Sequence, residues 1–227
     1  MNHRPQPPSA ARLYDPASEH DACGVAFVAR LGGGPSREVV ERGLLANENL
    51  FHRGAQGADP ETGDGAGILL QIPDAFLRAV VPFELPAPSH YGVAVCFLPQ
   101  DDAERERAER LLTDTVEAEG QQVLGWRDVP VRPARCGTSA RAVMPRIRQL
   151  FVGAAPELAH EHDAFERKLY VIRRLAVRAA EPSLYVASFS SRTIVYKGML
   201  TSLQLPEFYP DLGEEGVTSS VAGALPS

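Results

Sequence analysis

The sequence predicts a globular protein with its own core and a layered α+β fold, and three observations lead to this expectation. Strand-like segments joined by short turns mix with helices that are too few to give one crossover per strand, as a doubly wound parallel sheet would need. The 227 residues suffice for a hydrophobic core without metal or disulfide support. With 44% hydrophobic and 23% charged residues, the composition is ordinary for a globular protein, and no internal repeat is present.

The chain opens on a polar leader, residues 1–22, which has three prolines before position 9. Leu13 and Tyr14 are its only large hydrophobic residues, so it lacks the apolar stretch of a secretory signal. Residues 24–29 then read as a buried strand. After a glycine turn, Ser36 is a suitable N-cap for a helix to about residue 49, which would bury Val40, Leu44 and Leu45.

The middle of the chain alternates between the two kinds of element. A polar, glycine-rich loop over 52–67 leads to a strand over 68–72 and a short helix over 74–80. An apolar run over 91–98 predicts a central strand. Helical spacing of apolar residues over 103–118 predicts an amphipathic helix with a Glu106–Arg110 pair on its solvated face, and the strand that follows covers 123–129.

The last third contains a strand over 146–152 and a helix over 164–179. Two strands, 185–189 and 193–197, are expected to pair around Ser190, Ser191 and Arg192. Residues 213–227 have few large apolar side chains and no sustained period. We expect them to form a loose, low-complexity tail that cannot bury enough surface to offset its ordering entropy.

Charge and hydropathy exclude several functional classes. The net charge of −6 provides no basic field for nucleic acid or an anionic membrane. The longest apolar run, residues 93–98, is far shorter than the ~20 residues of a membrane span. We therefore expect a cytoplasmic protein without nucleic-acid or membrane partners.

The three cysteines are scattered, which argues against a disulfide framework and a thiolate metal site. Cys96 lies in the predicted central strand and reads as a buried core thiol. Cys136 lies in a loop, where a structural role is the default. Cys23 differs, because it stands at the junction between the polar leader and the first strand.

Removal of the leader would give Cys23 a distinct chemistry. Its thiol would lie beside a free α-amine, whose reference pKa of ~7.7–8.0 suits a general base near neutral pH. An attached amine could therefore replace the histidine that usually activates a nucleophilic thiol. Gly24, which follows, would let a substrate approach the backbone closely.

A second motif is the loop that contains His52, Arg53 and Gly54, followed by Thr-Gly-Asp-Gly-Ala-Gly over 62–67. As a phosphate loop it lacks the lysine and the spacing of that motif. As a dinucleotide fingerprint it precedes a strand instead of following one. Taken alone, it is a tight glycine turn with a structural histidine.

Residues 13–77 closely resemble the start of the glutamate synthase large subunit. The segments VLGWRDVPV (123–131), FERKLYVIRR (165–174) and SFSSRTIVYKGML (188–200) are similar to the same family in the same order. The resemblance spans about residues 13–212. It implies a class II glutamine amidotransferase domain over 23–212, after a propeptide over 1–22, with the αββα four-layer sandwich of N-terminal nucleophile hydrolases, incomplete at its C-terminal side.

The resemblance also implies the roles of particular residues. Cys23 matches the catalytic nucleophile whose α-amine is the base, and Arg53 and Gly54 match the loop that supports it. Glutamine would be the substrate, and its ammonia would pass to 2-oxoglutarate in a separate domain. This chain would need no cofactor, whereas FMN and an iron–sulfur cluster would serve the complete enzyme. Its partners would be the remaining synthase domains or a small subunit.

The chain departs from the family pattern after residue 212. An arginine segment for the substrate carboxylate and an Asn-Gly oxyanion pair are expected there, but the three asparagines, Asn2, Asn47 and Asn49, never precede a glycine. We therefore expect a truncated domain with weak glutaminase activity, because losing one oxyanion donor typically costs ~10²–10³ in rate. Two alternatives remain open: a non-catalytic interaction or regulatory module, and an amidotransferase with another acceptor.

Overall fold

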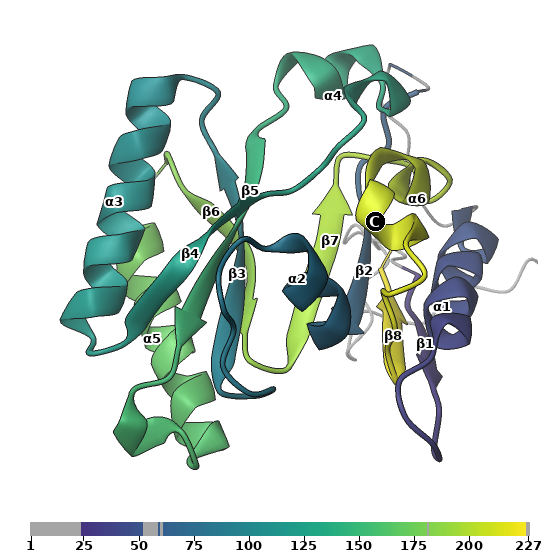
Figure 1. Ribbon diagram of the computed structural model, residues 1–227. Helices are drawn as coiled ribbons and strands as arrows, with labels where there is room; N and C mark the ends of the chain where they lie inside the picture. The colour runs from purple at the N-terminus through teal and green to yellow at the C-terminus, as the bar shows by residue number, and fades with distance from the viewer. Residues whose placement is uncertain (1–23, 52–58, 60, 181, 226–227) are drawn as a thin grey trace, which may run out of the picture.

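The computed structural model describes residues 24–51, 59, 61–180 and 182–225, and they form helices and strands in alternation (Figure 1). The order of the helices and strands is β1 (Ala26–Ala29), α1 (Arg37–Asn49), β2 (Ala66–Gln71), α2 (Asp74–Val80), β3 (Tyr91–Leu98), α3 (Asp102–Ala118), β4 (Gln122–Asp128), α4 (Thr138–Ala142), β5 (Arg146–Gly153), α5 (His162–Ala180), β6 (Tyr185–Ser190), β7 (Thr193–Gly198), α6 (Gln204–Phe208) and β8 (Val221–Ala224). Short 3₁₀ turns, among them η4 (Pro210–Gly213), join some of these elements.

The strands form two antiparallel sheets of four strands each. One has the order β4-β5-β3-β6 and the other the order β1-β8-β2-β7. The fold is thus mixed α/β with antiparallel sheets, as the shortage of crossover helices predicted. We call the first the helix-covered sheet, because α3 and α5 both pack on it, and the second the site sheet, for reasons given below (Figure 1).

The helix-covered sheet has two buried faces. Along β3, Ala94, Cys96 and Leu98 face α3 and α5, while Val93 and Val95 face the rest of the molecule. The first face packs on the side chains that the sequence predicted for α5, which are fully buried: Phe165, Leu169, Ile172 and Ala176. A strand buried on both faces reads as a continuous apolar run, which is why β3 was predictable as a central strand.

The site sheet is covered by α1, which lies beside β8, β1 and β2. Contact is close because both partners are small: a Cβ on Gly43 would lie 2.4 Å from the Cβ of Ala222. Val39 and Val40 of α1 are buried in the same cluster as Ile68 of β2. This packing corrects one detail of the sequence analysis, since Leu45 is 54% exposed and Leu44 only partly buried.

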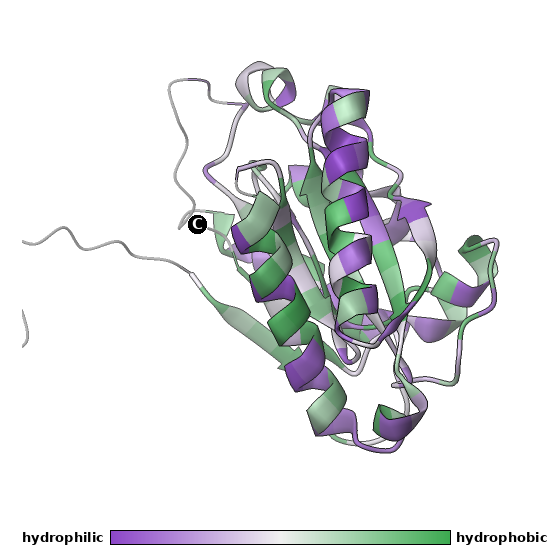
Figure 2. Ribbon diagram, turned by 90° about the vertical axis from the view of Figure 1, so that its left-hand side faces the viewer, coloured by the Kyte–Doolittle hydropathy of each residue, from purple (hydrophilic) through white to green (hydrophobic). Residues whose placement is uncertain are grey.

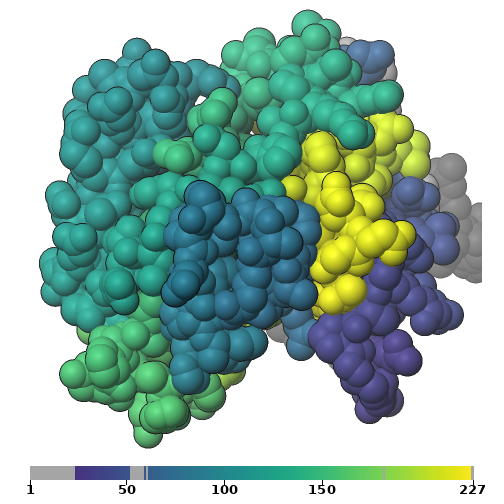
Figure 3. Space-filling view, in the orientation of Figure 1, coloured from purple at the N-terminus to yellow at the C-terminus, as the bar shows by residue number. Residues whose placement is uncertain are grey.

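The expectation of a loose tail after residue 212 is wrong for the part of it that the structure describes. Strand β8 lies inside the site sheet and pairs with β1 on one side and β2 on the other. Val217, Ser219 and Ala222 are fully buried, and the space-filling view shows the C-terminal residues packed between N-terminal segments (Figure 3). This strand could not be recognised in the sequence because its residues are small. Close packing against α1 requires small residues, and these do not give the run of large apolar side chains by which a buried strand is recognised.

The predicted pairing of residues 185–189 with 193–197 is also wrong. Both strands exist, but β6 pairs with β3 in the helix-covered sheet and β7 pairs with β2 in the site sheet. The turn at Ser190–Arg192 therefore crosses from one sheet to the other. Glu166 of α5 holds it, accepting hydrogen bonds from the hydroxyls of Ser190 (3.1 Å) and Ser191 (2.6 Å).

The first strand is an edge strand and not the buried strand that its apolar run suggested. Val25 and Phe27 are 68% and 69% exposed, and β8 is the strand that β1 pairs with. The remaining predicted elements are confirmed to within a few residues, and α2 has the predicted bounds. The Glu106–Arg110 ion pair is present at 3.4 Å.

Candidate active site

Three candidate residues from the sequence, Cys23, Arg53 and Gly54, lie outside the described residues. Their described neighbours are Gly24 at the entry to β1, Phe51 after α1, and the loop from residue 59 into β2. The site can therefore be built only from the described neighbours of these residues in the sequence, and the roles of the three residues stay predictions.

A cavity of about 430 Å³ opens at Gly24 and Val25, the two residues that follow Cys23. Its walls come from the start of β2, the end of β7, the residue after β8, and one side chain of β3. The other lining residues are Asp64, Gly65, Ala66, Gly67, Phe97, Val195, Lys197, Gly198, Met199 and Leu225. Because most of these belong to the β1-β8-β2-β7 sheet or its loops, the cavity defines that sheet as the site sheet.

The loop before β2 is glycine-rich for a steric reason. A Cβ on Gly63 would lie 2.4 Å from the carbonyl oxygen of Leu200, and one on Gly67 would lie 2.9 Å from the Cβ of Lys197. These contacts place the loop directly against the end of β7. Residues 64–67 of this loop thus form a close backbone wall of the cavity, and a side chain at the preceding Gly63 would not fit against Leu200.

Asp59 anchors the other end of this loop. Its carboxylate accepts hydrogen bonds from the Ser139 amide (3.1 Å), the Thr62 hydroxyl (2.8 Å) and the Glu61 amide (3.1 Å). These hydrogen bonds, with that from the Ser139 amide the largest contribution, lower the pKa of Asp59 to about 2. The ionised carboxylate therefore ties the loop to the start of α4.

The end of β7 contributes the cation of the cavity lining. The ammonium of Lys197 donates a 2.6 Å hydrogen bond to the Tyr185 hydroxyl and lies 4.8 Å from the centre of that ring. The carbonyl of Lys197 accepts a 2.7 Å hydrogen bond from the Tyr209 hydroxyl. Lys197 and Asp64 are the two charged residues among the described residues of the lining, so the cavity presents one charge of each sign.

A smaller apolar cavity of about 150 Å³ adjoins this one. The two share Phe97, Lys197, Gly198 and Met199, and the smaller one continues toward Cys136 and Phe208. Cys136 is buried and directs its thiol at the Pro133 carbonyl (3.1 Å), which fits the structural role predicted for it. Cys96 is the predicted core thiol: it has no exposed surface, and burial raises the pKa of its thiol.

A buried polar cluster behind β7 was not predicted. The Arg127 guanidinium donates two 2.8 Å hydrogen bonds to the Asp211 carboxylate and a third, of 2.9 Å, to the side-chain oxygen of Gln149. The Tyr196 hydroxyl donates to the same carboxylate at 3.0 Å, and burial, followed by that carboxylate, raises the pKa of Tyr196. The cluster joins β4, β5, β7 and η4 across the two sheets. The segments that contain Arg127 and Asp211 were both noted in the sequence, but nothing in the sequence indicated that these two side chains contact each other.

Two further observations concern cofactors and membranes. Among the residues described, no group of three or more His, Cys, Asp or Glu side chains is placed to hold a metal ion. The described cysteines, Cys96 and Cys136, point into different clusters and do not suit an iron–sulfur centre. No helix of the described residues is long and apolar enough to cross a membrane.

The described residues thus form two antiparallel sheets, one of which borders a cavity at Gly24 and Val25. The sequence pattern of the class-II glutamine amidotransferases matches residues 23–224, so the chain belongs to this enzyme family. That match begins at Cys23 and extends through β8, the strand that composition alone did not reveal.

Curated relatives add a narrower similarity. The chain is 47% identical over 221 residues to the glutamate synthase [NADPH] large chain of Bacillus subtilis. It is 44% identical over 216 residues to the ferredoxin-dependent glutamate synthase 1, chloroplastic/mitochondrial, of Arabidopsis thaliana. These alignments cover 96% and 92% of this chain but 14% and 13% of the relatives. The chain therefore spans about a seventh of the length of the curated relatives that it matches.

Proposed function

We propose that this chain is the glutamine-hydrolysing part of a glutamate synthase and that Cys23 is its nucleophile. The observation that carries the proposal is the cavity that starts at Gly24, directly after Cys23, in a chain whose family match also begins at Cys23. The mixed charge of the lining, from Asp64 and Lys197, suits a zwitterionic amino acid. Residues 1–22 would be a propeptide, the catalytic part would run from residue 23 through β8, and the fold would be the four-layer αββα sandwich of N-terminal nucleophile hydrolases.

The proposed reaction uses the thiol and the α-amine of Cys23 after the leader is cut. The amine takes the thiol proton, and the thiolate attacks the side-chain amide carbon of glutamine. The carbon–nitrogen bond then breaks, and the leaving nitrogen receives the proton from the α-ammonium and departs as ammonia. Water hydrolyses the γ-glutamyl thioester, which releases glutamate and restores the thiol. Arg53 and Gly54 would orient the amine and the thiol.

In the complete enzyme, the ammonia would pass to 2-oxoglutarate in a separate domain. FMN and an iron–sulfur cluster would support the reduction there, with electrons from a nicotinamide or from ferredoxin, the donors that the names of the relatives print. The two described cysteines do not suit an iron–sulfur cluster, and no step of the proposed glutamine hydrolysis passes through the cluster or FMN. The partners would be the other synthase domains or a small subunit in a cytoplasmic enzyme.

The chain by itself is expected to turn over glutamine slowly, because no asparagine of the sequence precedes a glycine to form the oxyanion pair. The most direct test therefore measures a single chemical event. A glutamine analogue with a diazoketone in place of the amide alkylates a thiolate that attacks it. We expect it to label Cys23 in leader-free protein, as read by peptide mass spectrometry, and glutamine to protect against labelling.

Two variants control this experiment. Cys23→Ser should abolish labelling, whereas Cys136→Ser should leave it unchanged. Protein that retains Met1 should also resist labelling, because an acylated nitrogen cannot accept the thiol proton. Labelling of the uncut chain at the same rate would overturn the amine-assisted mechanism. Absence of labelling in the cut chain would favour a non-catalytic interaction module that retains this fold.

A further inference from the structure

A further cavity, of about 540 Å³, lies at the other end of the site sheet from Gly24, and we call it the far cavity. Strands β2 and β7 connect the two cavities, because Ala66 and Gly198 line the first, whereas Gln71 and Arg192 line the far cavity. Six residues of strand, at about 3.3 Å each, separate the two by about 20 Å. The far cavity is therefore a distinct space, and its volume is within the range of small-molecule sites.

The apolar walls of the far cavity are rigid. Pro35, Pro73 and Pro88, which are far apart in the sequence, line it together with Ile72. Ser89, also in the lining, has a φ of 68°, in the left-handed region that costs free energy in a residue other than glycine. Such a conformation persists only where the surrounding structure fixes the loop. The loop that carries Pro88 and Ser89 is thus a preformed wall.

The carboxylate in this lining is already occupied. Asp74 accepts hydrogen bonds from the Arg78 guanidinium at 2.8 and 3.0 Å and from the Tyr91 hydroxyl at 2.9 Å. Both carboxylate oxygens are therefore bound, and Arg78 neutralises their charge. The described lining of the far cavity thus has no free anion for the ammonium group of a ligand.

Two hydrogen-bond donors of the lining are only partly used. The side-chain oxygen of Gln71 accepts a 2.8 Å hydrogen bond from the Ser220 amide, whereas its Nε2 donates to no other described residue. Arg192 donates to Asp163 through Nη2, and its Nε and Nη1 have no acceptor in the described part of the chain. Free N–H groups of a planar guanidinium match the geometry of a carboxylate.

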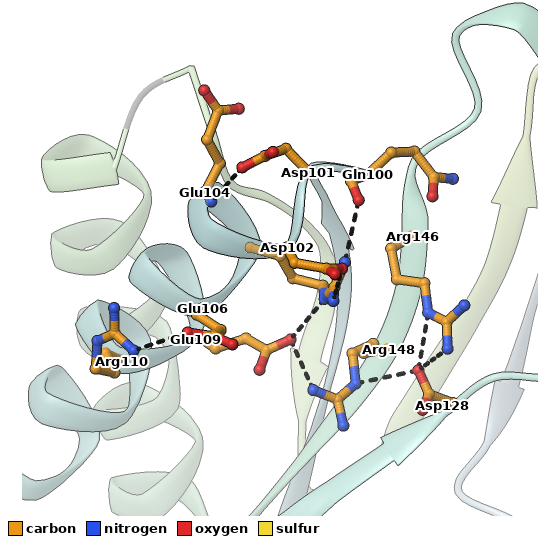
Figure 4. A network of polar contacts seen from close by, with 11 residues as sticks. Gln100, Asp101, Asp102, Glu104, Glu106, Glu109, Arg110, Asp128, Arg146 and Arg148 are labelled. Carbon is orange, nitrogen blue, oxygen red and sulfur yellow. Dashed lines mark hydrogen bonds and ion pairs between the residues drawn. The ribbon is translucent and has the colours of Figure 1, made fainter.

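Arginines at the helix-covered sheet are used more fully. Figure 2, which looks onto the helices of this sheet, shows α3 largely hydrophilic. Beside α3, Arg148 contacts Glu109 through Nη1 at 2.7 Å and Asp128 through Nε at 3.2 Å (Figure 4). Arg146 contacts the same Asp128 through Nε at 3.0 Å and Nη2 at 2.9 Å. Arg192 differs from both, because it keeps free donors at the wall of a cavity.

The charges near Arg192 limit the ligands that it can bind. The hydrogen bond to Asp163 raises the pKa of Arg192, and the Glu166 carboxylate adds to the rise, so the guanidinium stays ionised. Two carboxylates in its vicinity repel a ligand with two negative charges. A ligand with one carboxylate meets this limit, and it can also accept hydrogen bonds from Gln71 and from the Thr218 hydroxyl, which lines the same cavity.

We propose that the far cavity binds a small monocarboxylate that has an apolar body and no ammonium group. The carboxylate accepts hydrogen bonds from Arg192 and Gln71, and the apolar body lies on the proline-lined wall. An amino acid binds less well, because Asp74 has no oxygen free for its ammonium group. The inference is independent of the proposed function, since the far cavity shares no described lining residue with the cavity at Gly24.

Nuclear magnetic resonance on the full 227-residue chain, with hydrocinnamate as the probe, tests the proposal. Backbone amide signals of isotope-labelled protein should shift around Gln71, Ser89 and Arg192 and stay unchanged around Lys197. We expect a dissociation constant in the low millimolar range, because a probe this small makes few contacts. Phenylalanine, which adds an ammonium group to the same skeleton, and hydrocinnamamide, which lacks the charge, should each bind about tenfold more weakly. Inorganic phosphate should not displace the probe.

Two variants and a control locate the binding groups. Arg192→Gln removes the cation and should weaken hydrocinnamate binding about tenfold. Gln71→Glu keeps an oxygen to accept from the Ser220 amide but replaces the free nitrogen by a carboxylate oxygen, so it should weaken binding at least as much. The matched control is Arg42→Gln, at another exposed arginine that pairs with one carboxylate, Glu38, and it should bind the probe as the natural sequence does.

Several results would overturn the proposal. One is a natural chain whose signals do not shift at the solubility limit of hydrocinnamate, or shift only around Lys197. Another is hydrocinnamamide or phenylalanine binding as tightly as hydrocinnamate. Unchanged affinity in Arg192→Gln and Gln71→Glu would also contradict it. Signals distant from the far cavity should match those of the natural chain in each variant, which shows that the variant folds, and either variant alone suffices for the test.

Discussion

The two sheets of this molecule differ in the length of their strands and in the size of the residues at their closest contacts. The helix-covered sheet has strands of six to eight residues, its two inner strands β3 and β5 are buried on both faces, and large apolar side chains fill its core. The site sheet has two strands of only four residues, and Gly43, Ala222 and Gly67 occur where its parts approach most closely. The inner strands of the helix-covered sheet are therefore packed on both sides. The site sheet buries large residues such as Ile68 and Tyr196 in the core shared by the two sheets, and its small residues let backbone segments meet around a cavity.

The comparison teaches where each kind of substitution should act. In the helix-covered sheet, removal of side-chain volume should cause the damage. In the site sheet, addition of volume should do so. The Arg127–Asp211 pair belongs to neither sheet alone, because it ties β4 of the first to the segment that leads into β8 of the second. The following predictions test this division, from the largest effect to the smallest.

Breaking the pair between the sheets should have the largest effect. Arg127→Met leaves the Asp211 carboxylate, which is 3% exposed, without its cation. Loss of one partner of a buried ion pair typically costs about 3–5 kcal/mol in the free energy of unfolding. Urea denaturation measures it. Arg146→Met, in the exposed pair with Asp128, should cost less than about 1 kcal/mol.

Removal of volume from the helix-covered sheet should come next. Leu112→Ala on α3 empties a fully buried site in the core between α3, α5 and the sheet, for an expected loss of about 3 kcal/mol. The same substitution at Leu45, which is 54% exposed, is the matched control and should change stability by less than about 0.5 kcal/mol. Equal losses at both positions would contradict the described packing.

Addition of volume in the loop that leads to the cavity wall should be costly, although it adds only one methyl group. Gly63→Ala would place a Cβ 2.4 Å from the backbone oxygen of Leu200, which cannot rotate away. We expect a loss of about 1–3 kcal/mol. Gly34→Ala, where nothing lies within 4 Å of the new Cβ, should be nearly neutral. A neutral Gly63→Ala would show that the loop is not held against β7.

The smallest predicted effect concerns acid. The pKa of Asp59 is about 2 in the folded protein, below its ordinary value of 3.8, so its ionised form stabilises the fold above pH 3.8. That contribution should fade as the pH falls from about 4 toward 2. Asp59→Asn should therefore destabilise the protein at neutral pH, and the difference from the natural sequence should shrink across this range. Thermal unfolding at several pH values measures it, and a constant difference would contradict the assignment.

Prediction from the sequence succeeded where a side-chain period carries the information. Helix α5 and strand β3 could be located because their buried residues recur every 3.6 positions or form one apolar run. Prediction failed at β8, since a strand of small residues resembles a loop. It also failed for the pairing of β6 and β7, since the short turn between two strands does not show which sheet each strand joins. For the site, glycine spacing indicated a tight turn but not that Leu200 lies against it.

The sequence by itself determined the order of elements, the buried faces of the long helices and the special position of Cys23 between a polar leader and a strand. Only the tertiary structure decided that Gly24, Asp64 and Lys197 line one cavity, and that Arg127 meets Asp211 across 84 positions of the chain. The physical reason is the range of the interactions. Periodicity is a local property of the chain, whereas a cavity and a buried ion pair exist only after distant segments have packed.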